Sequence, residues 1–306
     1  MRLLSSDERA PADLAGAVIA LGNFDGFHRG HQAVVARAVA RARAEGRPAI
    51  VATFDPHPAR FFQPAAPPFR LTSIAQRARL FAAAGADATL VLAFDAAMAK
   101  LDPATFVDLL ADRFAASAVV TGQDFTFGRA RAGNPAVLAE LAGKRNIGVE
   151  TVAPVTDGAG SISSSRIRAA LAEGDCETAT TLLTRPFAIE GEVIHGDKLG
   201  RTIGFPTANI ALGEYQRPRY GIYAVRGRID DGRVVDGAAN LGVRPSFDPP
   251  KELLEPYFFD FAEDLYGRTI EVELISFIRP EAKFDSLEAL VAQMDRDCDE
   301  ARRRLR

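Results

Sequence analysis

The feature that most constrains the fold is a change of hydrophobic pattern near the middle of the 306-residue chain. In the first half, short apolar runs of strand type alternate with longer runs of helical type. This alternation is typical of a parallel sheet with helices on its faces. In the second half, short apolar runs follow one another with only Gly, Pro and Asp turns between them, which favours an antiparallel barrel. The sequence therefore predicts two domains of different fold class.

The first half is expected to form five strands of one parallel sheet. Right-handed crossovers would place the carboxyl ends of these strands along one edge, where ligands of such sheets bind. The expected strands are 17–24, 49–54, 88–94, 117–122 and 147–152, and the expected helices are 31–46, 73–86, 103–114 and 134–145. A further helical stretch is expected over 163–183.

The junction between the two patterns lies at Pro186, because a proline discourages the preceding residue from staying helical. We place the domain boundary there, between residues 1–185 and residues 186–306. The second domain is expected to end in a helix over 285–306. Its expected strands are 189–196, 221–229, 233–242, 253–261 and 269–278.

Charge and cysteine content exclude several classes of protein. The formal net charge is −3 and no basic stripe is present, which argues against a nucleic-acid partner. Cys176 and Cys298 are the only cysteines, so a disulfide framework and a cysteine-built zinc site are excluded. No segment has the apolar length of a signal peptide or a membrane span, so we expect a cytoplasmic protein without a membrane partner.

The segment GNFDGFHRGH follows the first strand after the N-terminus and opens the first long helix. Gly22, Gly26 and Gly30 allow a tight turn and a close approach of backbone to ligand. The helix start offers free N–H donors, and His28 and His31, three residues apart, can face one point. Together these features predict a phosphate-binding site.

Two other interpretations of this segment are open. It could be a turn with two exposed histidines, or part of a zinc site completed by His57. A catalytic zinc usually takes three protein ligands, and His57 opens a different loop beside a proline. No cysteine or acidic residue has matching spacing, so phosphate binding is the favoured interpretation.

A second glycine-rich segment, GDKLGRTIGFPTANI, lies in the C-terminal half. Gly196, Gly200 and Gly204 recur every four residues, with Lys198 and Arg201 between them. Such spacing suits a loop whose N–H groups wrap phosphates. It is neither a Walker loop nor a dinucleotide fingerprint, and no helix follows, so the residues alone leave an ordinary loop possible.

Several motifs in series carry a family resemblance. Residues 22–31 resemble the H-x-G-H signature of the nucleotidylyltransferase superfamily. The segments 53–58, 121–134 and 163–175, in that order, resemble the adenylyltransferase module of the bifunctional riboflavin kinase/FAD synthetases. The PTAN segment, residues 206–209, resembles the signature of riboflavin kinases. The resemblance extends from about residue 15 to the end of the chain.

The resemblance implies a Rossmann-like FMN adenylyltransferase domain and an antiparallel β-barrel riboflavin kinase domain with a C-terminal helix. The implied activity is phosphorylation of riboflavin to FMN and adenylylation of FMN to FAD with release of pyrophosphate. Riboflavin, FMN and ATP would be the small-molecule partners, FMN and FAD the products, and Mg²⁺ the cofactor. Other divalent ions could substitute for Mg²⁺.

In the N-terminal domain, the resemblance implies that His28 and His31 contact the ATP phosphates. The serine-rich start of the helical stretch would act from the opposite side, although it could be only a helix cap. Aromatic residues would line a flavin pocket, with core packing as the alternative. The expected ATP ligands are Gly22, Asn23, Phe24, Gly30, Ser164, Ser165, Arg166 and Arg168. The expected flavin ligands are Phe61, Phe62, Asp124, Phe125 and Phe127.

In the C-terminal domain, Glu255 falls where riboflavin kinases carry their catalytic glutamate, although an ordinary surface glutamate is the alternative. Pro256 biases Glu255 toward an extended conformation, as at the end or edge of a strand. Thr207 and Asn209 would contact Mg²⁺ and phosphate. The expected ATP ligands are Gly196, Lys198, Gly200, Arg201, Gly204 and Pro206, and the expected flavin ligands are Tyr223, Asn240 and Arg244.

The family pattern is not matched everywhere. Many relatives carry a β-branched residue and a histidine where this chain has Pro256 and Tyr257, and a threonine in place of Ser246. Three other functions compete with this interpretation: a nucleotidylyltransferase for another substrate, a non-catalytic flavin-binding or regulatory protein, and an RNA-binding barrel. The last is disfavoured by the acidic balance of the chain.

Overall fold

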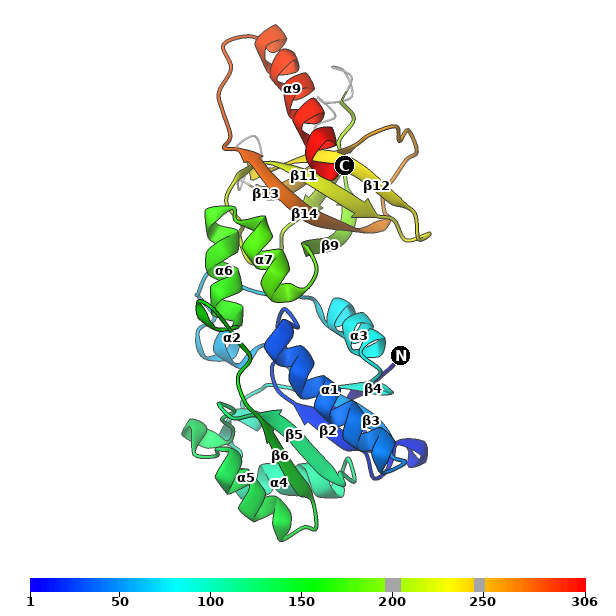
Figure 1. Cartoon of the computed structure of the whole chain (residues 1–306), viewed down its shortest axis with the longest axis vertical. Coiled ribbons are helices and arrows are strands. Elements are labelled where there is room, and N and C mark those ends of the chain that lie inside the picture. The colour runs from blue at the N-terminus through cyan, green and yellow to red at the C-terminus, as the bar shows by residue number, and fades with distance from the viewer. Residues whose placement is uncertain (196–204, 245–250) are drawn as a thin grey trace. The chain divides into compact units, whose positions relative to one another are not determined.

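The computed structural model describes residues 1–195, 205–244 and 251–306 of the chain, drawn in colour in Figure 1. Within this part of the chain, a six-stranded parallel sheet has helices on both faces, and a closed antiparallel barrel is followed by a C-terminal helix. The predicted fold class is therefore confirmed.

The described residues divide into two compact units. The first unit consists of Met1–Pro67 and Ser73–Ser163, and the second of Pro68–Thr72 and Ser164–Arg306. The second unit therefore contains the barrel together with the helical region that precedes it in sequence. It also contains a short segment from the first half of the chain.

The sheet of the first unit has the spatial order β1–β4–β3–β2–β5–β6, with all neighbours parallel. The chain runs outward from β2 through β3 to β4, then crosses back to place β5 on the other side of β2. The carboxyl ends of β2 and β5 therefore meet at a topological switch point, where ligands of open α/β sheets bind. The strands are β1 (Arg2–Ser5), β2 (Val18–Leu21), β3 (Ala49–Asp55), β4 (Ala88–Ala93), β5 (Ala118–Gly122) and β6 (Gly148–Val152).

Alternate residues of each strand supply two separate cores, one on each face of the sheet. Val18 and Ala20 pack with helices α1 and α3, whereas Ile19 and Leu21 pack with α4 and α5 (Figure 1). Side-chain caps at Ser73, Asp102 and Asn134 begin three of these helices. The helices are α1 (Arg29–Ala44), α2 (Pro58–Phe62), α3 (Ile74–Ala83), α4 (Pro103–Asp112) and α5 (Pro135–Gly143).

The helical stretch expected over 163–183 is two helices, α6 (Ser164–Glu173) and α7 (Cys176–Leu183). The break occurs at Gly174, whose φ of 78° lies in the left-handed region that ends helices. Asp175 then begins α7, because its carboxylate accepts a hydrogen bond from the Thr178 N–H at 2.9 Å.

The barrel closes in the order β10–β13–β12–β11–β14–β9, since β9 and β10 also pair. Helix α9 covers its outer surface, where Cys298 and Ala301 pack against Ala224 and Ala238. The elements are β9 (Phe187–Ile194), β10 (Asn209–Ala211), β11 (Gly221–Arg228), β12 (Val234–Arg244), β13 (Lys251–Phe258), β14 (Thr269–Arg279) and α9 (Leu287–Leu305).

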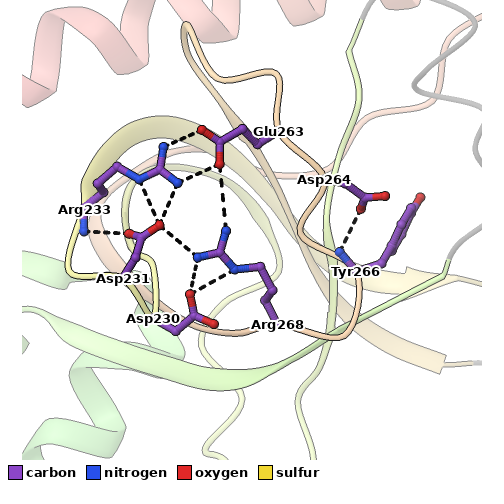
Figure 2. A network of polar contacts seen from close by, with 7 residues as sticks. All are labelled: Asp230, Asp231, Arg233, Glu263, Asp264, Tyr266 and Arg268. Atoms are coloured by element: carbon purple, nitrogen blue, oxygen red, sulfur yellow. Dashed lines mark hydrogen bonds and ion pairs between the residues drawn. The ribbon is translucent and has the colours of Figure 1, made fainter.

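An ion-pair network fastens the β11–β12 turn to the loop between β13 and β14 (Figure 2). Arg233 contacts Asp231 and Glu263, each at 2.6 Å. Arg268 contacts Asp230 and also Asp231, the latter at 2.9 Å. Hydrogen bonds from these guanidinium groups lower the pKa of all three carboxyl groups. The two loops are therefore held together by charge.

Several short elements were not predicted. They are brief and carry too few residues for a periodic pattern to be recognised. β1 is an edge strand in which only Leu4 is buried, and α2 is about one and a half turns long and begins at a proline. The others are β10, the hairpin β7 (Thr156–Asp157) and β8 (Gly160–Ser161), and the 3₁₀ turns η1 (Ala12–Leu14), η2 (Met98–Lys100) and η3 (Arg129–Arg131).

Candidate active sites

The loop that leaves β2 is tightly coiled before it enters α1. Phe24, Gly26 and Phe27 have φ values of 50°, 86° and 44°. The loop ends at His28, whose Nδ1 accepts a hydrogen bond from the His31 N–H at 3.4 Å and so caps the helix. The His28 and His31 rings stack with centroids 3.6 Å apart and an interplanar angle of 20°. The two imidazoles therefore lie together at the start of a helix, beside the switch point of the sheet.

The cap uses one of the two ring nitrogens of His28. Because Nδ1 is the acceptor of the cap, Nε2 is the His28 ring nitrogen that can donate to a ligand. The Nε2–H group and the N–H groups of Arg29 and Gly30, which precede the capped His31 N–H, are donors suited to an anion. Gly30 makes the arrangement possible, because a Cβ there would lie 3.1 Å from Cε1 of His28.

Side chains from two neighbouring strands and from helix α3 hold the backbone of this loop in place. Thr121 on β5 donates its hydroxyl to the Leu21 carbonyl at 2.9 Å. Thr53 on β3 donates to the Asn23 carbonyl at 2.7 Å, and the buried Arg77 of α3 donates to the same carbonyl at 3.0 Å. Sequence reasoning did not identify these three residues. The sequence feature that could have indicated them is a hydroxyl or charged side chain within an otherwise apolar strand or helix face.

The aromatic residues that follow β5 differ in exposure. Phe127 is buried in the core and packs against Phe106, with ring centroids 5.3 Å apart. Phe125 is half-buried and stacks on Phe127 at 5.8 Å, while Asp124 is exposed. Core packing, the alternative weighed for these rings, therefore applies to Phe127, and Phe125 and Asp124 are the more accessible members of the predicted flavin pocket.

A second group of aromatic rings lies on α2 and after β4. Phe61 and Phe62 both contact Phe94, with centroids 5.5 and 5.8 Å away. Phe62 is 64% exposed, which is unusual for so large an apolar side chain. The exposed ring of Phe62, which packs against Phe61 and Phe94, is therefore suited to stacking against a flat ring system.

His57 has a local structural role, because its Nδ1 accepts the Ala59 N–H at 3.1 Å and caps α2. Among the residues that the structure describes, no group of three or more His, Cys, Asp or Glu side chains could hold a metal ion. The zinc interpretation of His57 with the two stacked histidines therefore has no support in the geometry.

Ser164, Ser165, Arg166 and Arg168 form the first turns of α6, in the second compact unit. Within that unit, Arg168 Nε donates to the Phe69 carbonyl at 2.8 Å, and its guanidinium lies 5.0 Å from the centre of the Phe69 ring. His28 and His31 belong to the first unit, so a joint action of all six residues on ATP stays a prediction.

In the barrel, Glu255 lies between two amide side chains. Asn240 faces it across the β12–β13 ladder, and Asn240 Nδ2 donates to Glu255 Oε2 at 3.3 Å. On the other side, β10 pairs with β13, and the bond from Ala208 N to the Pro256 carbonyl at 2.9 Å continues that register. Asn209 then stands opposite Glu255. Residues opposite one another share a face, so the three polar groups lie together.

Glu255 was expected at the end or edge of a strand, and this expectation is wrong. Strand β13 has β10 on one side and β12 on the other. Pro256 is tolerated inside it because its backbone faces Ala208, just where the pairing with β10 begins. Its carbonyl accepts the Ala208 N–H there, so its missing N–H removes only one bond of that pair.

The oxygen-rich group around Glu255 fits a hard cation such as Mg²⁺. Thr207 precedes the buried Asn209 by two residues and lies just before β10, so its place on the same face stays a prediction. In the described part of the chain, the Asn240 Oδ1 atom is buried without a hydrogen-bond partner. An orphaned carbonyl oxygen beside a carboxylate is a suitable position for a donor or a cation.

Other predicted residues of the barrel are less informative. Tyr223 is fully buried and donates its hydroxyl to the Arg219 carbonyl, so a flavin contact by it stays a prediction. Arg244 ends β12, and Pro206 is exposed. Ser246 and five of the predicted ATP ligands lie outside the described residues. Those five are Gly196, Lys198, Gly200, Arg201 and Gly204.

A pocket of about 560 Å³ lies elsewhere in the second unit, among α7, β14 and the end of α9. Its lining includes no predicted site residue. Burial raises the pKa of the Cys176 thiol there to about 12, so this cysteine stays protonated and unreactive. The lining residues are Gly174, Asp175, Cys176, Glu177, Thr180, Thr181, Pro186, Ile275, Ser276, Phe277 and Arg304.

Comparison with known proteins assigns a family to each half of the chain. A family model described as FAD synthetase matches residues 10–166, and one described as riboflavin kinase matches residues 183–305. A bifunctional riboflavin kinase/FMN adenylyltransferase from Escherichia coli K12 is 39% identical over 92% of this chain and 90% of its own length. A protein of the same name from Pseudomonas fluorescens is 41% identical over 94% and 92%.

One solved structure is similar over 99% of both chains, with a TM-score of 0.87 and 32% identity. It is described as a macrolide-efflux protein from Streptococcus pneumoniae. In the present chain, no helix of the described part is both long and apolar enough to cross a membrane. On the two family matches and the similarity to relatives over nearly its whole length, the chain belongs to the bifunctional riboflavin kinase/FMN adenylyltransferases.

Proposed function

We propose that the protein converts riboflavin to FMN and then FMN to FAD, using one ATP for each step. The observation that supports this proposal is that each unit gathers polar residues suited to binding phosphate or accepting a proton. The first unit has the stacked His28 and His31 at a helix start. The second has Glu255 hydrogen-bonded to Asn240 on the barrel. The predicted cytoplasmic location stays a prediction.

In the adenylyl transfer, a phosphate oxygen of FMN attacks the α-phosphorus of ATP, and the bond to the leaving pyrophosphate breaks. The nucleophile is already an anion, so no strong base is needed. The site must align the two reactants and neutralise charge. His28, His31 and the N–H groups that open α1 supply donors at one point for this purpose.

For the flavin of this step, we propose a platform on α2. Phe62 offers an exposed ring, and Phe61 and Phe94 pack beside it. Phe125 and Asp124, after β5, are the other accessible candidates at the carboxyl edge of the same sheet. Stacking on such a face would hold the flavin ring system at this edge of the sheet.

In the kinase step, a riboflavin hydroxyl attacks the γ-phosphorus of ATP, the bond from that phosphorus to the leaving ADP breaks, and the hydroxyl proton must leave. Glu255 accepts this proton, and the hydrogen bond from Asn240 Nδ2 orients its carboxylate. Thr207 and Asn209 would hold Mg²⁺ through oxygen atoms. When bound, the ion neutralises charge on the transferred phosphate.

Two substitutions test the assignment of steps to sites. Glu255→Ala is expected to lower FMN formation from riboflavin by about 10²- to 10⁴-fold, the usual contribution of a general base. FAD formation from supplied FMN should survive in the same protein. Glu192→Ala, at an exposed position on β9, is the matched control and should leave both rates unchanged.

His28→Ala is expected to do the reverse, lowering FAD formation while riboflavin phosphorylation survives. Product chromatography after separate incubation with riboflavin or with FMN, each with ATP and Mg²⁺, measures both steps. If either variant loses both activities while still folded, the assignment of one step to each site is wrong.

A further inference from the structure

The loop before the two histidines is held in a conformation that its own residues do not favour. Phe24 and Phe27 have φ values of 50° and 44°, in the left-handed region that side chains with a Cβ rarely adopt. Such residues keep this backbone only where their surroundings fix it, and they concentrate at functional sites. The residues that surround this loop therefore fix the conformation on which the proposed site depends.

Helix α3 supplies the fixing contacts from two residues one turn apart. Phe81 is fully buried, and its ring meets the rings of Phe24 and Phe27 edge-on, with centroids 5.7 and 5.1 Å away. Arg77, four residues earlier and so on the same face of the helix, is 2% exposed. One face of α3 therefore contacts the aromatic side chains of the loop through Phe81 and the loop backbone through Arg77.

Arg77 and Thr53 close a triangle of hydrogen bonds on one carbonyl. Arg77 Nη1 donates to the Asn23 carbonyl at 3.0 Å and to Thr53 Oγ1 at 2.7 Å. The Thr53 hydroxyl then donates to the same Asn23 carbonyl at 2.7 Å. Asn23 immediately precedes Phe24, so the triangle fixes the chain where the unusual conformation begins.

A buried guanidinium is costly for a helix that packs against an apolar core. Arginine stays charged in proteins, and removing it from water must be compensated by hydrogen bonds. An apolar residue would pack at this position without that cost. Arg77 also places a positive charge beneath a loop whose proposed ligand is a polyanion.

We propose that Arg77 and Thr53 are positioning residues for adenylyl transfer. They fix the Asn23 carbonyl and so hold the loop in the conformation that stacks His28 on His31. Neither residue is required to touch ATP or FMN. This inference rests on the proposed function of the first unit.

The first test is Arg77→Met in the full-length protein. The kcat for FAD formation from FMN should fall by about 10- to 100-fold, the cost of displacing reactive groups by about 1 Å, while KM values change little. Riboflavin phosphorylation by the same protein is the internal control and should be unchanged. Arg79→Met, at an exposed position two residues further along α3, should leave both rates unchanged.

If Arg77→Met folds poorly, two smaller substitutions at Thr53 test the same proposal. Thr53→Val removes the hydroxyl with little change of shape, and should lower the kcat for FAD formation by about 10-fold. Thr53→Ser keeps the hydroxyl and should restore the rate to within about twofold of the wild type. Equal rates in the valine and serine variants would overturn the proposal.

The last test separates positioning from a general effect on folding. A His28→Ala protein has already lost one of the side chains that Arg77 is proposed to position. Adding Arg77→Met to it should therefore lower the rate of FAD formation by less than about threefold, because the effects of residues that act as a unit are not additive. Full multiplication of the two losses would overturn the proposal. Wild-type protein that makes no FAD from FMN and ATP would instead refute the proposed function.

Discussion

Gly30 shows how much a single residue without a side chain decides at the first site. An alanine Cβ would lie 3.1 and 3.2 Å from two atoms of the His28 ring. In Gly30→Ala, the ring must therefore shift, and FAD formation should fall by about 10-fold. Stability should not fall, since alanine favours a helix over glycine by about 1 kcal/mol. Steady-state rates and thermal unfolding measure the two effects.

Gly143→Ala is the matched control, since a Cβ at this position of α5 meets nothing within 4 Å. It should leave FAD formation unchanged. If Gly30→Ala makes FAD at the wild-type rate, the close stack of the two histidines is not needed for adenylyl transfer.

The buried thiol of Cys176 should make the free energy of unfolding of the protein depend on pH in the alkaline range. Burial raises the pKa of its thiol from 9.0 to about 12. Above pH 9 the unfolded chain releases this proton while the folded protein keeps it, so the free energy of unfolding should fall as pH rises toward 12. The slope is about 1.4 kcal/mol per pH unit for one such group. Chemical unfolding at several pH values measures it.

The comparison protein is Cys176→Ala, which lacks the titrating group. Other buried groups also titrate in this range, so the difference in slope between the two proteins is the quantity to measure. The wild type should lose stability more steeply above pH 9. Parallel curves would contradict the assigned shift of the Cys176 pKa.

What the sequence could predict about the site depended on distance along the chain. His28, His31 and Gly30 belong to one short motif at a strand-helix junction, so their proximity followed from local pattern. Thr53 and Arg77 act on Asn23 from 30 and 54 residues away. Only the packing of α3 and β3 against the loop brings them there, and no spacing rule in a single sequence expresses that contact.

At the scale of elements, the loops at one end of the barrel depend on the ion-pair network of Figure 2. Arg268→Gln should lower the midpoint of thermal unfolding at low salt, because it removes the contacts to Asp230 and Asp231. The effect should shrink at about 1 M salt, where charges are screened within about 3 Å. Differential scanning calorimetry at two salt concentrations measures this.

The matched control is Lys144→Gln, which breaks an isolated pair with Glu140 on α5. Exposed single pairs contribute little, so its midpoint should hardly change. The carboxyl groups of Asp230 and Glu263 have lowered pKa values in the folded protein. Their contribution to the free energy of unfolding is therefore present above the pKa of the unfolded chain and is lost as pH falls through the folded-state pKa. An Arg268→Gln effect that is independent of salt would contradict an electrostatic role.

Long periodic elements were predicted well, and short or interrupted ones were not. Strands β2 to β5 carry mostly apolar runs, and helices α1, α3, α4 and α5 carry an apolar stripe. The α6–α7 break depends on Gly174 adopting a positive φ, and a single glycine in a helical pattern is often tolerated instead. β10 begins at a buried Asn209, a residue type that does not indicate a strand.

At the scale of the whole molecule, α6 and α7 belong to the compact unit of the barrel although their sequence pattern continues that of the first half. A fragment of residues 164–306 should therefore melt at a higher temperature than one of residues 186–306. The shorter fragment loses the apolar surface that Leu171, Leu182 and Leu183 bury. Each such side chain contributes about 1.5–3 kcal/mol. Circular dichroism measures both midpoints.

Both fragments keep nearly all of the riboflavin kinase match at residues 183–305, so either can be assayed for riboflavin phosphorylation. Equal melting temperatures would show that α6 and α7 fold independently of the barrel, and the predicted boundary near residue 185 would then also be the boundary of stability.

The most direct test of the central claim is chromatography of the flavin products formed by the full-length protein with riboflavin, ATP and Mg²⁺. The account predicts that FMN accumulates first and that FAD follows from it. FMN without FAD would contradict the role given to the histidine site. The absence of any flavin product, from riboflavin or from supplied FMN, would contradict the two-step function as a whole.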